Sequence, residues 1–372
     1  MKRIAKTILI SVLSVCMLAS CTNKAPEHAG GIVMDTVFNV TVYGAPGLAE
    51  ELLDAGCELD EKVLNRFNEG SLISVYSARE LYDGSPEGSS AEAAGGPDAS
   101  SVTAVVSDYE ADLSDILARS EELREASYGA FDVRLGALSD LWDVKGRMSG
   151  DKGAVIPGPG EIENALGDRS VYDLGAVGKG IYLDMALDIL ERSGAQAAVV
   201  SAGGSVLVYG SKPGASGFRV AITDPFNPLS PLSSGEPFAT IVLTGGYFIS
   251  TSGSYERYFE YGGARYHHIL DPLSGYPAWT KEDIKNRSGI PSFALSSLFE
   301  MPSSVPVSVT VISQSGFYSD ALSTACFVLG PDMGISLAQQ YDSEVIFIMS
   351  DGEVVVSDGI IYNTDEKIIT IK

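Results

Sequence analysis

The chain of 372 residues is poor in basic residues and in the side chains that usually bind transition metals. It holds 25 lysines and arginines against 49 aspartates and glutamates, a formal net charge of −24, with 3 histidines and 4 cysteines. No cluster of lysine or arginine follows the first few residues. Because such a surface repels phosphate backbones, the composition excludes nucleic acid as a partner. The same field opposes an anionic ligand unless a metal ion or a helix N-terminus reverses it locally.

The four cysteines show no spacing that is typical of a metal site. Cys16 and Cys21 lie near the N-terminus, so only Cys57 and Cys326 belong to the body of the chain. Each falls in a helical pattern of apolar residues, which favours two buried thiols. A disulfide is the alternative, and it would require the two cysteines to lie close together in the fold.

The first residues have the pattern of a targeting segment. A segment with three basic residues, MKRIAK at 1–6, precedes an apolar run at 8–18. This run is too short for a membrane span, which needs about 20 residues. The run ends in Leu18-Ala-Ser-Cys21, which resembles the bacterial lipoprotein box, where the cysteine is lipidated; an ordinary cleaved signal is the alternative. We expect a signal peptide at 1–20, a lipid on Cys21, a tether at 21–31, and an exported protein anchored to the cell membrane, facing the periplasm or the exterior.

The body of the chain, residues 32–372, mixes strand and helix patterns without regular alternation, which favours a single α+β domain. Apolar spacing predicts helices over 48–67, 108–127, 178–193, 320–329 and 333–341. It predicts strands over 32–43, 171–174, 197–200, 206–209, 218–222, 239–243, 307–312, 345–349 and 354–356. Residues 83–101, rich in Gly, Ser, Ala and Pro, indicate a low-complexity surface insertion.

A glycine-rich segment, DLGAVGKG at residues 173–180, lies between a predicted strand and a predicted helix. Free backbone N–H groups and the positive end of a helix can bind an anion there, and Lys179 adds a full charge. The segment matches neither a Walker A loop nor a dinucleotide-binding fingerprint. A plain turn with a solvated lysine is the alternative.

Two further clusters hold polar residues that could act chemically. Asp320 and Thr324 are four residues apart, on one face of a predicted helix, and their oxygens suit Mg²⁺ or Ca²⁺. A helix-capping aspartate is the alternative. His267 and His268 precede an Asp-Pro turn, and in a strand only one of the two neighbours can face a given site. A structural histidine is the alternative here.

These segments, in this order, resemble the flavin transferase family of bacterial FAD:protein FMN transferases, once called thiamine-biosynthesis lipoproteins. The matching motifs are MDT (34–36), NRF (65–67) with SLIS (71–74), GAFD (129–132) with LW (141–142), DLGAVGKG (173–180), SAGG (201–204), STSGSY (250–255), HILDP (268–272) with GYP (275–277), and DALST (320–324). Each motif is weak alone, but eight in sequence are highly specific, and they span nearly the whole chain after the leader.

Three positions depart from the usual motifs of that family. The first motif reads Met-Asp-Thr, with Asp35 in place of the usual glycine of Met-Gly-Thr. The segment FDVRLGA at 131–137 replaces the frequent Phe-Asp-Pro-Thr-Val-Gly-Pro. Ser205 replaces the aspartate of the frequent Gly-Gly-Asp. Arg134 therefore changes the hydrogen bonding expected at the flavin, and Ser205 removes one possible polar contact.

The resemblance implies one domain that binds FAD and Mg²⁺, moves FMN onto a threonine or serine hydroxyl of an acceptor flavoprotein, and releases AMP. The residues that it implies around FAD are Met34, Phe67, Ala130, Phe131, Asp132, Asp173, Lys179 and Leu270. The metal ligands that it implies are the Ala176 carbonyl, Asp320 and Thr324, with Ser323 nearby. An FAD pyrophosphatase, in which water replaces the hydroxyl, and a flavin-binding lipoprotein without catalysis are the alternatives.

Transfer requires a group that takes the proton of the attacking hydroxyl. A histidine with an ordinary pKa suits that role at neutral pH, so we expect His268 to act as base or positioning group and its loss to cost about 10²–10⁴ in rate. His267 should face away, and its replacement should be nearly silent. In the alternative, Asp320 or the metal makes a separate base unnecessary.

Overall fold

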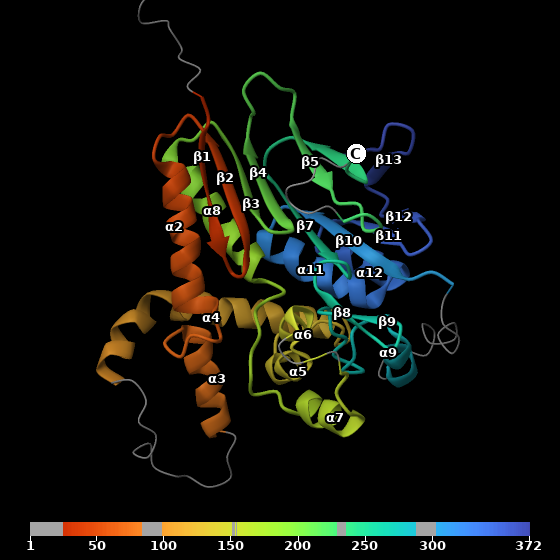
Figure 1. Ribbon diagram of the computed structural model, residues 1–372. Helices are drawn as coiled ribbons and strands as arrows, with labels where there is room; N and C mark the ends of the chain where they lie inside the picture. The colour runs from red at the N-terminus through yellow and green to blue at the C-terminus, as the bar shows by residue number, and fades with distance from the viewer. Residues whose placement is uncertain (1–24, 84–98, 151–152, 154, 229–235, 288–302) are drawn as a thin grey trace, which may run out of the picture.

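An eight-stranded sheet runs through the middle of the protein (Figure 1). The structure, a computed structural model, describes residues 25–83, 99–150, 153, 155–228, 236–287 and 303–372. Neighbouring strands of this sheet all pair antiparallel. Their order is β1 (Glu27–Val33), β2 (Thr36–Tyr43), β3 (Ala197–Ala202), β4 (Ser205–Gly210), β7 (Tyr247–Gly253), β10 (Pro306–Ser313), β11 (Glu344–Met349) and β12 (Val354–Val356).

The central strands of this sheet are buried on both faces. Because successive side chains point to opposite sides of a strand, Val345 and Phe347 of β11 enter one hydrophobic cluster while Ile346 and Ile348 enter another. A second, four-stranded sheet covers the latter face. Its order is β13 (Ile360–Asn363), β14 (Ile368–Ile371), β6 (Ala239–Leu243) and β5 (Phe218–Ile222).

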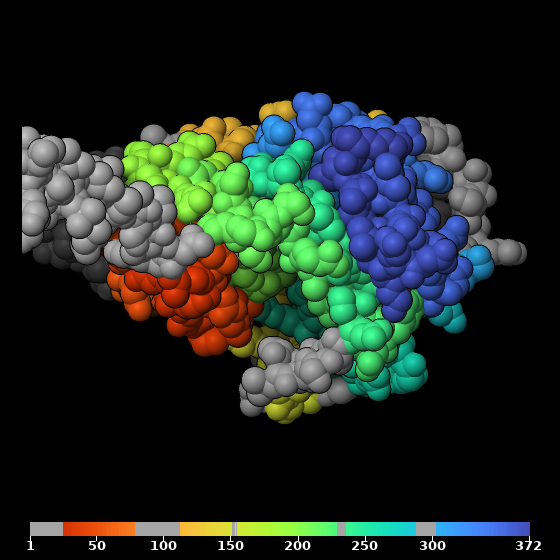
Figure 2. Space-filling model, turned by 90° about the horizontal axis from the view of Figure 1, so that it is seen from above, coloured from red at the N-terminus to blue at the C-terminus, as the bar shows by residue number. Residues whose placement is uncertain are grey.

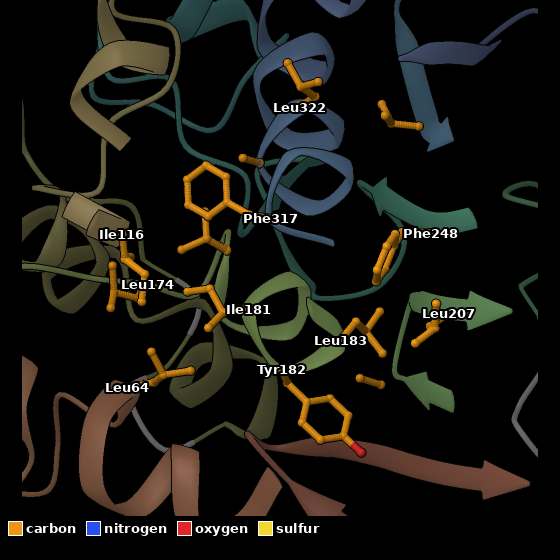
Figure 3. Packing of buried hydrophobic residues seen from close by; sticks show 14 of the residues in the cluster. Leu64, Ile116, Leu174, Ile181, Tyr182, Leu183, Leu207, Phe248, Phe317 and Leu322 are labelled. Atoms are coloured by element: carbon orange, nitrogen blue, oxygen red, sulfur yellow. The ribbon is translucent and has the colours of Figure 1, made fainter. Parts of the chain in front are cut away.

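Helices cover the opposite face of the large sheet. They are α2 (Leu48–Leu59), α8 (Gly178–Ser193), α11 (Gly316–Leu329) and α12 (Pro331–Gln340). Figure 3 shows Ile181 of α8, Phe317 of α11 and Phe248 of β7 within this cluster. The protein is therefore a three-layer stack of helices, large sheet and small sheet, which confirms the predicted α+β class. Seen from above, the red N-terminal strands and the blue C-terminal strands lie at opposite ends, with green β4 and β5 between them (Figure 2).

A smaller unit lies below the sheet in Figure 1 and has its own hydrophobic cluster. Trp142 is fully buried at its centre, stacks on Tyr266 and donates its indole N–H to the Gly275 carbonyl at 2.8 Å. The elements of this unit are α5 (Gly136–Trp142), α6 (Val144–Ser149), α7 (Pro159–Gly167), β8 (Tyr258–Tyr261) and β9 (Ala264–His267). The remaining elements are the π-helical turn η1 (Asp60–Leu64), α3 (Leu72–Asp83), α4 (Ala99–Ala126) and α9 (Lys281–Asn286).

Many predicted elements are confirmed, among them α8, β5, β6 and β12 with the predicted bounds. The predicted strand at 171–174 is wrong. The backbone N–H groups of this segment form hydrogen bonds to two unrelated residues, Ser77 and Val133, and not to one neighbouring strand. The helix predicted over 48–67 ends at Leu64, where Asn65 turns to an extended backbone. Most of the predicted insertion at 83–101 lies outside the described residues, and α4 begins at Ala99.

The structure also corrects the N-terminal prediction. Residues 27–31, predicted as tether, belong to β1 and pair with β2, and the predicted strand at 32–43 is a hairpin interrupted at Met34 and Asp35. Gly30 and Gly31 carry no side chain, so hydrophobic alternation gives no signal there. Cys21 lies outside the described residues. Among the residues that the structure does describe, no helix is long and apolar enough to cross a bilayer.

The prediction of two buried thiols is half correct. Cys326 is buried, its thiol donates to the Gly334 carbonyl at 3.3 Å, and burial raises the pKa of the thiol. Cys57 is exposed, because it lies on the face of α2 that points away from the sheet. Both cysteines are free, so the disulfide alternative is excluded.

Candidate active site

The N-terminal turns of α8 and α11 touch through two glycines. A Cβ atom on Gly180 would lie 2.2 Å from the Gly316 carbonyl oxygen, and one on Gly316 would lie 2.3 Å from the Gly180 carbonyl oxygen. No side chain fits at either position, which explains glycine there. Asp184 fixes the contact by accepting hydrogen bonds from the Gly316 and Phe317 amides at 2.6 and 2.8 Å. Two helix starts therefore meet at one point.

This contact places Asp320 at the start of α8. Its Oδ2 accepts the Gly180 N–H at 3.0 Å, and its Oδ1 accepts the Ser205 hydroxyl at 3.2 Å and pairs with the Lys179 ammonium at 3.1 Å. The side chain is 4% exposed, against 24% for Lys179. Asp320 is not a helix cap, because α11 begins at Gly316 and Ser315 caps it. Ser205, which replaces the aspartate of the frequent Gly-Gly-Asp, donates its hydroxyl to Asp320.

The oxygens around Asp320 fit a hard divalent cation. Thr324 lies one turn further along α11, and its hydroxyl is 3.2 Å from the Ser252 hydroxyl, which also bonds Ser323 at 2.8 Å. The Ala176 carbonyl accepts no hydrogen bond from the described residues. Within that part of the chain no three acidic, histidine or cysteine side chains gather as a metal cluster. A cation here would therefore depend on one carboxylate, neutral oxygens and the substrate's phosphates.

The two histidines have different surroundings. His267 is buried, donates Nε2–H to the Ala278 carbonyl at 2.9 Å and accepts the Ile269 amide at Nδ1, so both ring nitrogens are satisfied. His268 Nδ1 lies 3.3 Å from the Arg257 carbonyl, which can only accept, so the proton is on Nδ1 and Nε2 carries the lone pair.

Burial makes His268 a much weaker base than an exposed imidazole. Burial, then the neighbouring His267, Arg257 and Lys179, lowers the pKa of His268 to about 3. The ring is therefore neutral at neutral pH and holds an added proton poorly. The expected ordinary pKa is wrong, because sequence carries no information about how deeply the ring is buried.

Asp132 lines a cavity of about 360 Å³. Its carboxylate accepts the Arg169 guanidinium at 2.8 Å and the Arg134 amide at 2.8 Å, and Arg134 also pairs with Glu121. The lining residues are Arg124, Glu125, Tyr128, Gly129, Asp132, Arg169, Pro272 and Leu273. Two arginines thus offset acidic charge at this cavity in a strongly acidic protein.

An exposed aromatic ring lies beside the glycine-rich segment. Phe67 is 76% exposed, and the Arg66 guanidinium lies 4.3 Å from its ring centre. Arg66 also pairs with Asp140 of α5 and reaches Asp173 at 3.6 Å, so it links three segments. The free ring face is a suitable surface for stacking a flat ligand ring.

The other predicted flavin-lining residues differ in position and burial. Met34 lies at the hairpin tip, with its sulfur 3.7 Å from the position of a Cβ on Gly178, close to the start of α8. Ala130 and Phe131 are 1% and 2% exposed and pack in the main core, so only their backbone could face a ligand. Leu270 packs with the Trp142 cluster and is 9% exposed.

Comparison with known proteins decides the family. The model of the ApbE family matches residues 34–283 and 300–348, which is more than half of the chain. The chain belongs to the ApbE family. This confirms the resemblance found in the motifs, and all eight motifs lie within the matched residues.

Relatives and solved structures of ApbE proteins cover almost the whole chain. The chain is similar to the FAD:protein FMN transferase of Treponema pallidum, with 28% identity over 95% of this chain and 93% of the relative. It is 26% identical to that of Vibrio cholerae over 92% of this chain and 93% of the relative. The crystal structure of apo flavinyl transferase ApbE from Pseudomonas stutzeri superposes with a TM-score of 0.62 at 25% identity, covering 90% of this chain and 95% of that one. An ApbE protein from Thermotoga maritima gives 0.64 at 24% identity.

The ApbE motifs brought most of the site to attention, but they left out several neighbours. Arg66 is the middle residue of the NRF motif, and Glu256 directly follows the STSGSY motif. Arg169 belongs to none of the motifs. The signal for Arg66 was its place between Asn65 and Phe67. Arg169 is reached only through its contact with Asp132, which the fold creates.

Proposed function

We propose that this ApbE protein transfers FMN from FAD to a threonine or serine hydroxyl of an acceptor flavoprotein and releases AMP. The observation that carries the proposal is the meeting of Lys179, the start of α8 and Asp320 at one point, in a chain whose relatives are FAD:protein FMN transferases. A lysine and a helix N-terminus attract a pyrophosphate, which the net charge of −24 would otherwise repel.

The chain's own residues act by binding and orientation. Lys179 neutralises phosphate charge, and the exposed ring of Phe67 offers a stacking face to the isoalloxazine. Asp132 and Asp173 accept hydrogen bonds from ring N–H or ribose hydroxyl groups. Phosphoryl transfer depends mainly on positioning and charge neutralisation, so no nucleophile from this chain is required.

We propose that the reaction depends on Mg²⁺. Asp320, Thr324 and the Ala176 carbonyl would hold the ion, and their oxygen chemistry fits it. When bound, such an ion neutralises phosphate charge and lowers the pKa of a coordinated hydroxyl. Lys179 already lies against Asp320, which supports a position where positive charge is stabilised.

One assay tests the function and separates it from FAD hydrolysis. The purified chain is incubated with FAD, Mg²⁺ and an acceptor flavoprotein, and the denatured acceptor is examined for covalent flavin fluorescence while AMP is measured. Transfer gives labelled acceptor and equal AMP. AMP with free FMN and no labelled acceptor identifies a pyrophosphatase and contradicts the proposal, as does FAD that binds without release of AMP.

We also propose that the protein is exported and lipid-anchored through Cys21, facing the periplasm or the exterior. Support comes from the basic and apolar leader followed by Leu18-Ala-Ser-Cys21. Cys21→Ser should move the protein from the membrane to the soluble exported fraction. A wild-type protein whose mass lacks a diacylglyceryl group would contradict this assignment.

A further inference from the structure

Glu256 carries a carboxylate that the described residues leave uncommitted. It follows β7, and its backbone N–H donates to the Gly253 carbonyl at 3.3 Å. Within the described chain, no hydrogen bond or ion pair engages its carboxylate oxygens. Asp320, by contrast, has both oxygens bonded. A charged group without a partner beside a site is available for a ligand or a proton.

The position of Glu256 places this carboxylate at the site. Its Oε1 lies 3.3 Å from where a Cβ on Gly204 would stand, and the next residue, Ser205, donates to Asp320. Glycine at 204 therefore leaves room for the carboxylate against the turn between β3 and β4. Glu256 and Asp320 thus approach the same turn from β7 and α11.

The surroundings of Glu256 combine access to solvent with many nearby protein atoms. The side chain is exposed to solvent, yet desolvation by nearby protein atoms raises the pKa of its carboxyl above the ordinary value. Lys179 and Arg257 oppose this rise, and Asp320 adds to it. The neighbouring Tyr255, whose pKa burial raises to about 12, stays protonated at neutral pH.

We propose that Glu256 accepts the proton of the acceptor hydroxyl as its oxygen attacks the FMN phosphorus of FAD. The new O–P bond forms while the P–O bond to AMP breaks, and AMP leaves with that electron pair. The proton passes to the Glu256 carboxylate and then to water, which restores the residue. This inference rests on the proposed transferase function.

The other candidates for this role are less suitable. His268 has its lone pair on Nε2, but burial and then its charged neighbours disfavour a positive ring and lower its pKa. Asp320 is occupied by Lys179, the Gly180 amide and Ser205. Glu256 alone among these three combines solvent access, negative charge and free oxygens.

The first test compares two glutamates of one segment. Glu256→Gln keeps the shape of the side chain but cannot take up a proton. Glu260→Gln, at an exposed position of β8, is the matched control. With FAD, Mg²⁺ and acceptor, Glu256→Gln should lower the transfer rate about 10²–10⁴-fold with FAD affinity nearly unchanged. Glu260→Gln should match wild type.

The second test uses readouts that a merely structural role would not change. Wild-type activity should rise with pH through the pKa of Glu256, and this acidic limb should vanish in Glu256→Gln. Glu256→Ala should regain rate when formate is added, because the small acid replaces the missing carboxylate.

The outcomes separate this inference from the proposed function. A wild type that labels the acceptor, with Glu256→Gln within threefold of it, overturns the role of Glu256. So does a variant that is slow but keeps the acidic limb and ignores formate. A wild type that never labels the acceptor overturns the transferase proposal and the role of Glu256 with it.

Discussion

Two groups of charged side chains differ in their access to water. In the sealed group, Arg287 pairs with Asp271 at 2.6 Å and with Asp283 at 2.7 Å, and all three side chains are at most 3% exposed. In the open group, Lys179 pairs with Asp320, while Glu256 is solvent-exposed and its carboxylate has no hydrogen-bond or ion-pair partner among the residues that the structure describes.

The difference shows what each group is built to do. The sealed group connects the Asp271 turn to α9. Arg287 also stacks on Trp279 and donates a hydrogen bond to the Val328 carbonyl, so the contacts of this group stabilise the fold. Burial raises the pKa of Asp271, and Arg287 opposes that rise. In the open group, the Glu256 carboxylate is exposed and keeps its hydrogen-bonding capacity free among the described residues. A titratable group with a shifted pKa is a better candidate for a functional role when it reaches solvent than when it is sealed in the core.

Loss of Asp320 should give the largest effect and should fall on activity. Asp320→Ala removes the carboxylate that holds Lys179 and the implied metal, so turnover should fall below detection, at least about 10³-fold. FAD binding should survive in part, because Phe67 and the start of α8 remain. AMP release and flavin fluorescence titration measure the two quantities.

The matched control for this change is Asp188→Asn, an exposed aspartate on the same helix as Lys179. It should turn over like wild type. Turnover that persists in Asp320→Ala, or in wild type treated with a chelator, would contradict the metal assignment.

Breaking the sealed group should instead cost stability. Arg287→Met leaves two buried carboxylates without their cation, so the free energy of unfolding should fall by about 3–5 kcal/mol. Denaturant unfolding measures it. Replacing Asp271 and Asp283 by asparagine in the same variant should recover part of that loss, since the unpaired charges are then gone. A loss below about 1 kcal/mol would show that the group is not structural.

Replacement of the two neighbouring histidines should likewise affect different properties, stability for His267 and activity for His268. His267→Ala should lower the free energy of unfolding by about 2–4 kcal/mol, because it opens a cavity beside Phe327 and removes two hydrogen bonds. The nearly silent replacement expected from sequence is thus limited to activity. The His268→Ala variant should still fold. Its transfer rate should be lower than that of wild type, but the rate should still rise with pH on the acidic side of the pH profile. A lost limb in His268→Ala would make that histidine the base.

The smallest effect should come from an exposed pair. Lys145 and Asp35 lie 2.7 Å apart with side chains 62% and 61% exposed. Lys145→Ala should change stability by less than about 0.5 kcal/mol, and 1 M salt should abolish the difference. A larger loss in thermal unfolding would mean that the hairpin tip is held more firmly than an ordinary surface pair allows.

Sequence predicted what depends on local pattern. The apolar spacing of 178–193 gave α8 with its bounds, and alternation gave β5 and β6, because each buries one regular face. The motifs also named Lys179 and Asp320, whose side chains do meet. The family then made these positions specific, since eight short motifs in order are rarely coincidental.

What sequence could not predict depends on contacts between distant segments. The role of Gly180 is visible only when Gly316, far along the chain, lies against it. The low pKa of His268 follows from burial that no motif encodes. The short helices α5, α6 and α7 lack a long apolar face, and they are stable because they pack around Trp142.

The contact between Gly180 and Gly316 has a consequence for the order of folding. The contact brings Lys179 and Asp320 together from two helices, and the strands β4, β7 and β10, which lie in the sheet beside those helices, lie between them in sequence. Closing so long a loop is slow relative to forming hairpins such as β1–β2. We therefore expect the site to be completed late in folding, after the chain between its two helices has reached its place. A flavin nucleotide that binds only the completed site stabilises the folded chain by mass action, so its bound fluorescence reports the last stage of folding.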